Sequence, residues 1–216
     1  HVSIEDDQVL LIKKDSRNAM FEQLGKYNIK WSIDDGIYYP KISEEFTATA
    51  AAQGCYRIFM PIEHPAIEIM HREHKYTQYD SQEKVRTGIS RACKLLRKHG
   101  IDFYVAIIVG FPEEDEKTLG IVKDYAQFVR EEGASWVSFF YPKPLPGTED
   151  YKNYHLVPEE RKWEISSHYW AFSTPVLEPQ KMKLEELSQA VNEISIEVNG
   201  YVGGSVSLCS VVLDIV

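Results

Sequence analysis

Acidic side chains stand directly after three of the apolar runs in this sequence of 216 residues. They are Asp6 and Asp7, then Asp34 and Asp35, and then Glu63, which is followed by His64. Carboxylates in such places can attract a cationic ligand, or transfer protons as general acids and bases. The sequence therefore predicts that acidic groups gather where these runs end.

A further run, from Tyr104 to Asp115, ends in a different way. Its sequence, YVAIIVGFPEED, stops being apolar at Gly110 and Pro112 and continues into carboxylates that are typical of the start of a helix. A strand that ends like this delivers backbone groups and acidic groups to one rim of a sheet.

Three histidines could in principle hold a metal ion. They are His64, His71 and His74, and Glu73 lies beside the last of them. His71 and His74 would share a face if their segment were helical. A solvated, turn-rich segment explains the same residues better, and His64, next to Glu63, is the histidine expected at the binding site.

The three cysteines, Cys55, Cys93 and Cys209, are too few and too scattered for a disulfide framework or for a metal site made of cysteines alone. Cys55 follows Gly54 into an apolar run, and both it and Cys93 are expected to be structural. This use of cysteine fits a reducing, cytoplasmic compartment.

Alternation of apolar runs with segments of helical period predicts βα units around a parallel sheet. The expected strands are Val2–Ile4, Ile29–Ile33, Tyr56–Ile62, Phe103–Val109 and Ser135–Tyr141. The carboxyl ends of parallel strands carry the site in such folds, so the polar residues after these runs should converge on one mouth.

The segments between the expected strands have the period of helices. From Ser81 to His99, one apolar stripe includes Cys93 and places it in the core, while Ser81 can cap the helix and Gly100 can end it. Further helices are expected from Glu114 to Glu132 and, more briefly, between Ser43 and Gly54. A last one is expected from about Leu184 to Val198.

Length, charge and composition restrict the possible classes of protein. With 44% hydrophobic residues the chain can bury a core, most simply as one domain at 1–150 with a mostly helical, aromatic extension at 151–216. The net charge of −9 argues against a nucleic-acid partner. The apolar tail at 201–216 is too short to span a membrane and is expected to form a buried or covered strand pair. Because the chain begins within a strand pattern, the natural protein is expected to be longer.

Five motifs in order resemble the radical S-adenosylmethionine enzymes, specifically the subgroup with an N-terminal cobalamin-binding domain. They are IEDDQ, DDG, AAQGCYRIFMPIEHP, KLLRKHGIDFYVAIIVGFPEED and YPKPLPGTEDY, within residues 1–155. The resemblance implies an α/β fold, a partial (β/α)6 TIM-like barrel, of which this chain supplies strands two to six.

The resemblance also implies where S-adenosylmethionine would lie. Asp6 and Asp7 would face its methionine amino end, while Glu63 would lie near the ribose and methionine, with His64 beside it. The adenine would lie by Gly110, Phe111 and Pro112, where the small glycine lets the backbone approach a flat base and Phe111 could stack. An acidic rim suits the sulfonium and ammonium of this cofactor.

Two of the acidic pairs have alternative explanations. Asp34, Asp35 and Gly36 fit a turn equally well. Asp6 and Asp7 could instead cap a helix that starts near Ser16.

One family motif is missing. Enzymes of this class hold a [4Fe-4S] cluster on a CxxxCxxC loop after the first strand, and no such motif occurs in these residues. No metal ligands are therefore expected in this chain, and the cluster loop and the cobalamin-binding segment are expected upstream of His1.

The implied function is that of a cobalamin-dependent radical S-adenosylmethionine methyltransferase, which uses a deoxyadenosyl radical at an unactivated carbon or phosphorus centre. Its partners would be a small-molecule substrate, an electron donor and the upstream segments, with no membrane and no nucleic acid. A cyclase, a methylthiolase or a ring-rearranging enzyme of the same family is the first alternative. A noncatalytic binding barrel, or an acid-base enzyme using Glu63 and Asp6, also remains open.

Overall fold

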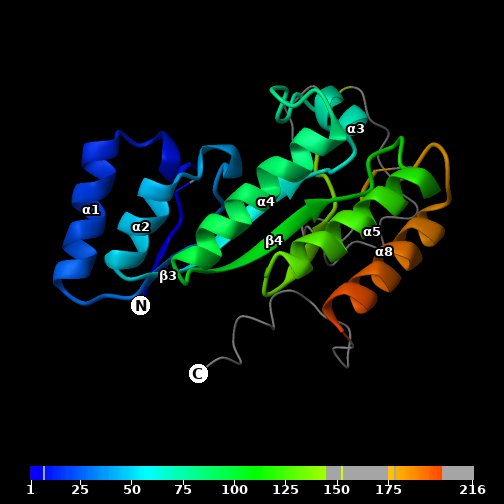
Figure 1. The fold of residues 1–216 in the computed structure, drawn as a ribbon. Coiled ribbons are helices and arrows are strands. Elements are labelled where there is room, and N and C mark those ends of the chain that lie inside the picture. Colours follow the sequence, from blue (N-terminus) through cyan, green and yellow to red (C-terminus); the bar gives the residue numbers. More distant parts are fainter. Residues whose placement is uncertain (7, 145–151, 153–174, 178, 201–216) are drawn as a thin grey trace. The chain divides into compact units, whose positions relative to one another are not determined.

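A computed structural model of the protein describes residues 1–6, 8–144, 152, 175–177 and 179–200 (Figure 1). Five strands form one sheet in the order of the sequence. They are β1 (Val2–Ile4), β2 (Trp31–Ile33), β3 (Cys55–Glu63), β4 (Asp102–Ile108) and β5 (Val137–Phe140). The first four pair in parallel. All five predicted strands are present, so the α/β prediction is confirmed.

The last pairing follows from the backbone hydrogen bonds of β4. The Val105 N–H donates to Trp136 O at 3.0 Å, and the Val109 N–H donates to Phe140 O at 2.8 Å. Donor and acceptor advance in the same direction along both strands, so β5 is also parallel to its neighbour.

The chain divides into two compact units, one made of residues 1–107 and 125–138 and the other of residues 108–124 and 139–216. In the first unit, α1 (Lys14–Lys26), α2 (Glu44–Ala52) and α4 (Gln82–Lys98) lie side by side (Figure 1). Their apolar faces are buried, and so are Ile58, Met60 and Ile62, alternate residues of β3. The residues of β3 between them are half-buried, as expected for a strand whose two faces have different surroundings.

Two serines start helices in this unit as their types suggest. The Ser81 hydroxyl accepts a bond from the Lys84 N–H at 3.4 Å, and that of Ser43 accepts one from the Phe46 N–H at 3.2 Å. Cys93 is fully buried within α4, as its apolar stripe predicts. The predicted helices α2 and α4 are thus confirmed, and so is the predicted Ser81 cap of α4.

One expectation about this unit is wrong, and so is one of the alternative explanations. The segment after β3 contains a short helix, α3 (Ile67–Arg72), whose Ile69 and Met70 are buried, where turns in solvent were expected. Six residues make fewer than two helical turns, so they show no helical period in the sequence. A helix this short is stable only through tertiary packing. The first helix begins at Lys14, with no side-chain cap, so Asp6 does not cap it. A 3-10 turn, Val9–Leu11, precedes it.

In the second unit, α8 (Leu184–Asn199) confirms the last predicted helix and buries Leu184, Leu187, Val191 and Ile194. It lies beside the first half of α5 (Glu116–Glu131), to which the Lys123–Glu197 ion pair of 2.6 Å joins it (Figure 1). The predicted boundary at residue 150, the aromatic segment after it, the tail at 201–216, Cys209 and Asp7 lie outside the described residues. Among the described helices, none is both long and apolar enough to cross a membrane.

Candidate functional site

The end of β3 presents a carboxylate in a strained backbone conformation. Glu63 is the last residue of the strand and has φ 60°, a left-handed value that is unusual for a residue with a side chain. Pairing with β4 shifts by one residue between Pro61 and Glu63. Such conformations cost free energy and persist where the surrounding structure enforces them, often at functional sites.

The Glu63 carboxylate is loosely paired and close to the surface. It pairs with Lys75, with 3.4 Å between Oε1 and Nζ, and its side chain is 16% exposed. The charge of Glu63 adds to burial in raising the pKa of Tyr76, so the carboxylate lies near that phenol. Tyr76 donates a hydrogen bond to Pro61 O at 3.2 Å and stacks on Tyr38. Aromatic rings therefore support the segment that presents Glu63.

His64 differs from its neighbour. It is only 2% exposed, and its Nδ1 accepts a hydrogen bond from the Ala66 N–H at 3.0 Å. An accepting Nδ1 places the proton of the neutral ring on Nε2. Through this bond His64 contacts the turn that leads into α3, and its binding of a ligand stays a prediction.

Asp34 lies at the centre of a polar network in the same unit. Its Oδ2 accepts hydrogen bonds from the hydroxyls of Ser3 at 2.7 Å and Ser32 at 2.5 Å, while its Oδ1 lies 3.8 Å from the Arg57 guanidinium. Burial and the nearby Asp34 charge both raise the pKa of Tyr104. The sequence left a turn and a site equally open here, and the network shows that Asp34 joins β1, β2 and β3.

Asp6 is exposed and stabilises its own turn, because its Oδ1 accepts a hydrogen bond from the Gln8 N–H at 3.0 Å. The expected role of Asp6 toward a ligand stays a prediction.

In the second unit, Gly110 follows β4 with φ 94°, a conformation that favours glycine. A Cβ atom there would lie 2.6 Å from the ring of Tyr141 and 3.3 Å from Leu187 of α8. Phe111 is 5% exposed. The close approach that the glycine allows is therefore made by Tyr141, where the sequence suggested a flat ligand.

Glu114 is a residue whose role the sequence did not predict. It is fully buried, and its Oε2 accepts a hydrogen bond from the Gly110 N–H at 2.8 Å. Its own N–H donates to Phe111 O at 2.9 Å. These two bonds close the turn at residues 110–114. The one sequence feature that could have indicated this role is the position of the Glu114 carboxylate four residues after Gly110.

Asp115 caps α5. Its Oδ1 accepts a hydrogen bond from the Thr118 N–H at 3.0 Å, and its N–H donates to the Thr118 hydroxyl at 2.9 Å. Its Oδ2 pairs with Lys181 at 2.9 Å, and this contact, with the cap, lowers the pKa of Asp115 to about 2. Asp115 is therefore ionised at neutral pH, where a helix start favours negative charge.

Comparison with solved structures identifies the fold. The chain is similar to a radical S-adenosylmethionine methyltransferase, TsrM, from Kitasatospora setae, whose structure has cobalamin and a [4Fe-4S] cluster bound. The TM-score is 0.53 at 17% identity, over 66% of this chain and 28% of that one. The chain is also similar to coproporphyrinogen III oxidase (HemN) from Escherichia coli, a radical S-adenosylmethionine enzyme, with TM-score 0.50 and 16% identity over 74% and 37% of the two chains.

The described chain thus has the fold of radical S-adenosylmethionine enzymes, which confirms the predicted resemblance at the level of the fold. It spans well under half the length of either protein. No family model matches the sequence, and no curated protein matches it significantly.

The described residues do not fit an iron–sulfur cluster. Cys55 and Cys93 are buried free thiols, and burial raises the pKa of each to about 12, whereas a cluster needs thiolates. Among the described side chains, no group of three or more His, Cys, Asp or Glu could hold a metal ion. Cluster ligands must come from elsewhere if a cluster is bound.

Proposed function

We propose that this chain is the S-adenosylmethionine-binding part of a cobalamin-dependent radical enzyme, a methyltransferase acting on an unactivated carbon or phosphorus centre. The observation that carries the proposal is the fold, which matches TsrM over two thirds of the chain. The strained, half-buried Glu63 at a strand exit supports it, because parallel βα folds bind ligands at these ends.

Glu63 would accept hydrogen bonds from the ammonium of the methionine part or from the ribose hydroxyls. Its pairing with Lys75 is long and partly exposed, so a ligand can replace Lys75 at small cost. Asp6, and with it Asp7 and His64, would complete the same side of the site. Gly110, Phe111 and Pro112 would form the wall beside the adenine through their backbone.

The iron–sulfur cluster and the cobalamin would be held by other parts of the protein, as would the contacts to the electron donor. When bound, these groups supply redox and methyl-transfer chemistry, and this chain supplies binding and orientation. The small-molecule substrate would belong to the complete enzyme.

Substitution of Glu63 tests the binding role directly. In the anaerobically reconstituted full-length protein, Glu63→Ala should weaken S-adenosylmethionine binding roughly tenfold, because a charged acceptor is lost. Glu83→Ala, at an exposed carboxylate in the first turn of α4, is the control and should bind like the wild type. Titration calorimetry measures both, and equal affinities would remove Glu63 from the site.

The reaction itself needs a second measurement. The reconstituted full-length protein should convert S-adenosylmethionine to deoxyadenosine, and methylated product should require cobalamin. Cleavage without methyl transfer would favour a cyclase, a methylthiolase or a ring-rearranging enzyme. Absence of cleavage, with a cluster shown by spectroscopy, would favour a noncatalytic binding barrel.

A further inference from the structure

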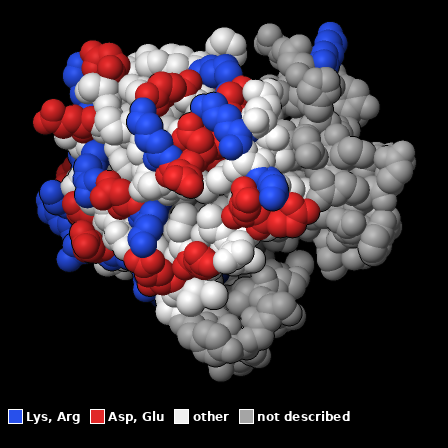
Figure 2. Space-filling model, turned by 90° about the vertical axis from the view of Figure 1, so that its right-hand side faces the viewer, with Lys and Arg blue, Asp and Glu red and all other residues white. Residues whose placement is uncertain are grey.

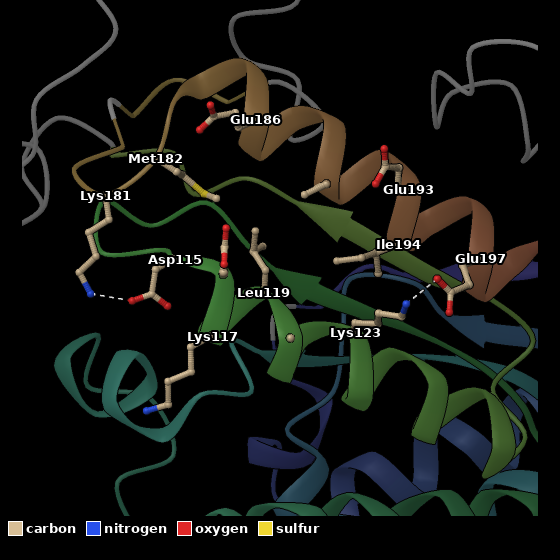
Figure 3. A pocket seen from close by; sticks show the side chains of 13 residues that line it. Asp115, Lys117, Leu119, Lys123, Lys181, Met182, Glu186, Glu193, Ile194 and Glu197 are labelled. Atoms are coloured by element: carbon tan, nitrogen blue, oxygen red, sulfur yellow. Dashed lines mark hydrogen bonds and ion pairs between the residues drawn. The ribbon is translucent and has the colours of Figure 1, made fainter.

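The turn that follows β4 is held from outside by a segment almost seventy residues later in the chain. The Gln180 N–H donates to Pro112 O at 2.8 Å. Lys181 Nζ donates to Asp115 Oδ2 at 2.9 Å (Figure 3). These two bonds reach the first and last residues of the tetrapeptide Pro112 to Asp115. Residues 180 and 181 thus form a clamp on this turn.

Contacts from within the turn and from outside it hold different parts of the turn. The Glu114 carboxylate accepts a hydrogen bond from the Gly110 N–H, and Tyr141 and Leu187 pack against Gly110. These contacts fix the beginning of the turn. The Pro112 carbonyl accepts from Gln180, which lies outside the turn. Asp115 uses one carboxylate oxygen for the cap of α5 and the other for Lys181.

We propose that Lys181 is a positioning residue for the nucleoside half of S-adenosylmethionine, because it fixes the backbone of Gly110–Asp115 through Asp115. This role rests on the proposed function, in which that backbone forms the adenine wall. Lys181 itself touches Asp115 and acts through it. The residue comes from the extension that follows the barrel motifs, so the extension would complete the binding wall.

The groove between α5 and α8 provides a matched control. At its other end, Lys123 of α5 and Glu197 of α8 form a second ion pair, of 2.6 Å (Figure 3). The two lysines have similar side-chain exposure, 52% for Lys181 and 43% for Lys123. Lys123 lies two turns along α5 from Asp115, so its loss should leave the turn unchanged.

Four variants of the full-length protein separate the clamp from the other contacts. Lys181→Met removes the cation, and Lys181→Arg restores it. Asp115→Asn removes the charge but keeps a good helix cap. Lys123→Met removes the control pair. On the face shown in Figure 2, Lys and Arg are mixed with Asp and Glu over the described surface.

Hydrogen exchange of the peptide that covers residues 108–116 measures the clamp, and titration with S-adenosylmethionine measures its effect on binding. Lys181→Met and Asp115→Asn should each exchange about three times faster in that peptide and bind roughly two- to fivefold more weakly. Lys181→Arg and Lys123→Met should resemble the wild type in both measurements.

Unchanged exchange in Lys181→Met would overturn the clamp, and faster exchange with unchanged affinity would overturn its role in positioning. An equal effect of Lys123→Met would also overturn it, because the effect would then be one of general stability. If the wild type does not bind S-adenosylmethionine, the proposed function and the role of Lys181 are both overturned. If the wild type binds it and Lys181→Met binds it equally well, only the role of Lys181 is overturned.

Discussion

The ends of β3 and β4 both turn the chain through a left-handed residue, but they do so with opposite chemistry. β3 ends on Glu63, with φ 60° and a carboxylate that lies 3.4 Å from the Lys75 ammonium. β4 is followed by Gly110, with φ 94°, and the carboxylate of this turn, Glu114, is fully buried on a backbone N–H.

The difference indicates two roles. A glycine would adopt the conformation at the end of β3 with less strain than Glu63 does, and the ligand-binding role proposed for the Glu63 carboxylate would account for this residue. At the end of β4, glycine avoids the strain and the carboxylates brace the turn from within. The first turn presents its carboxylate near the surface, and the second uses its buried carboxylate to hold its own backbone.

The largest expected effect comes from Gly110→Ala. The new Cβ would lie 2.6 Å from the Tyr141 ring on a backbone that disfavours side chains, so unfolding free energy should fall by roughly 2–4 kcal/mol. Gly120→Ala is the control, because a Cβ there meets nothing within 4 Å and lies within α5, and it should raise stability by about 1 kcal/mol. Denaturant titrations measure both free energies of unfolding. Similar effects of the two variants would show that the turn at residue 110 does not require a glycine.

Glu114→Ala should have the next largest effect. It leaves the buried Gly110 N–H without its acceptor, which should cost about 1–3 kcal/mol in the same titrations. Glu116→Ala, at an exposed position two residues later, should change stability by only a few tenths of a kcal/mol. If the two variants were equally stable, Glu114 would not be a brace.

Glu63→Gly should have a smaller effect of opposite sign. Relief of the left-handed strain should raise stability by about 0.5–1 kcal/mol, while Glu63→Ala keeps the strain and should not. Both variants should lose affinity for S-adenosylmethionine. A glycine variant that is less stable than the wild type would argue that Glu63 is present for structural reasons.

The smallest effect concerns pH. The pKa of Asp115 is lowered from 3.8 to about 2, so its contribution to stability is complete above 3.8 and is lost as the pH falls through about 2. The stability difference between the wild type and Asp115→Asn should therefore shrink between pH 4 and pH 2. Thermal unfolding at several pH values measures it, and a constant difference would contradict the role of Lys181.

Repeating patterns made much of the fold predictable. All five strands and the helices α2, α4, α5 and α8 follow from apolar period, and Ser81 caps its helix as expected. The helix α3 was missed, because six residues carry no period and the burial of Ile69 and Met70 comes from distant contacts.

The site was predictable only in part. Strand ends were located correctly, since alternation stops at polar residues and glycines. The separate roles of the carboxylates at these ends were not predictable, because Asp34, Glu63 and Glu114 look alike in the sequence as carboxylates near strand ends. One joins three strands, one is near the surface and one is buried.

The sequence by itself determined that Tyr104 to Asp115 is a strand followed by a glycine turn and a helix, because short-range periodicity and residue type control these steps. Tertiary structure alone decided that Tyr141 covers Gly110 and that Lys181 reaches Asp115. Contacts between residues so far apart depend on how the chain packs, and packing leaves no local pattern in the sequence.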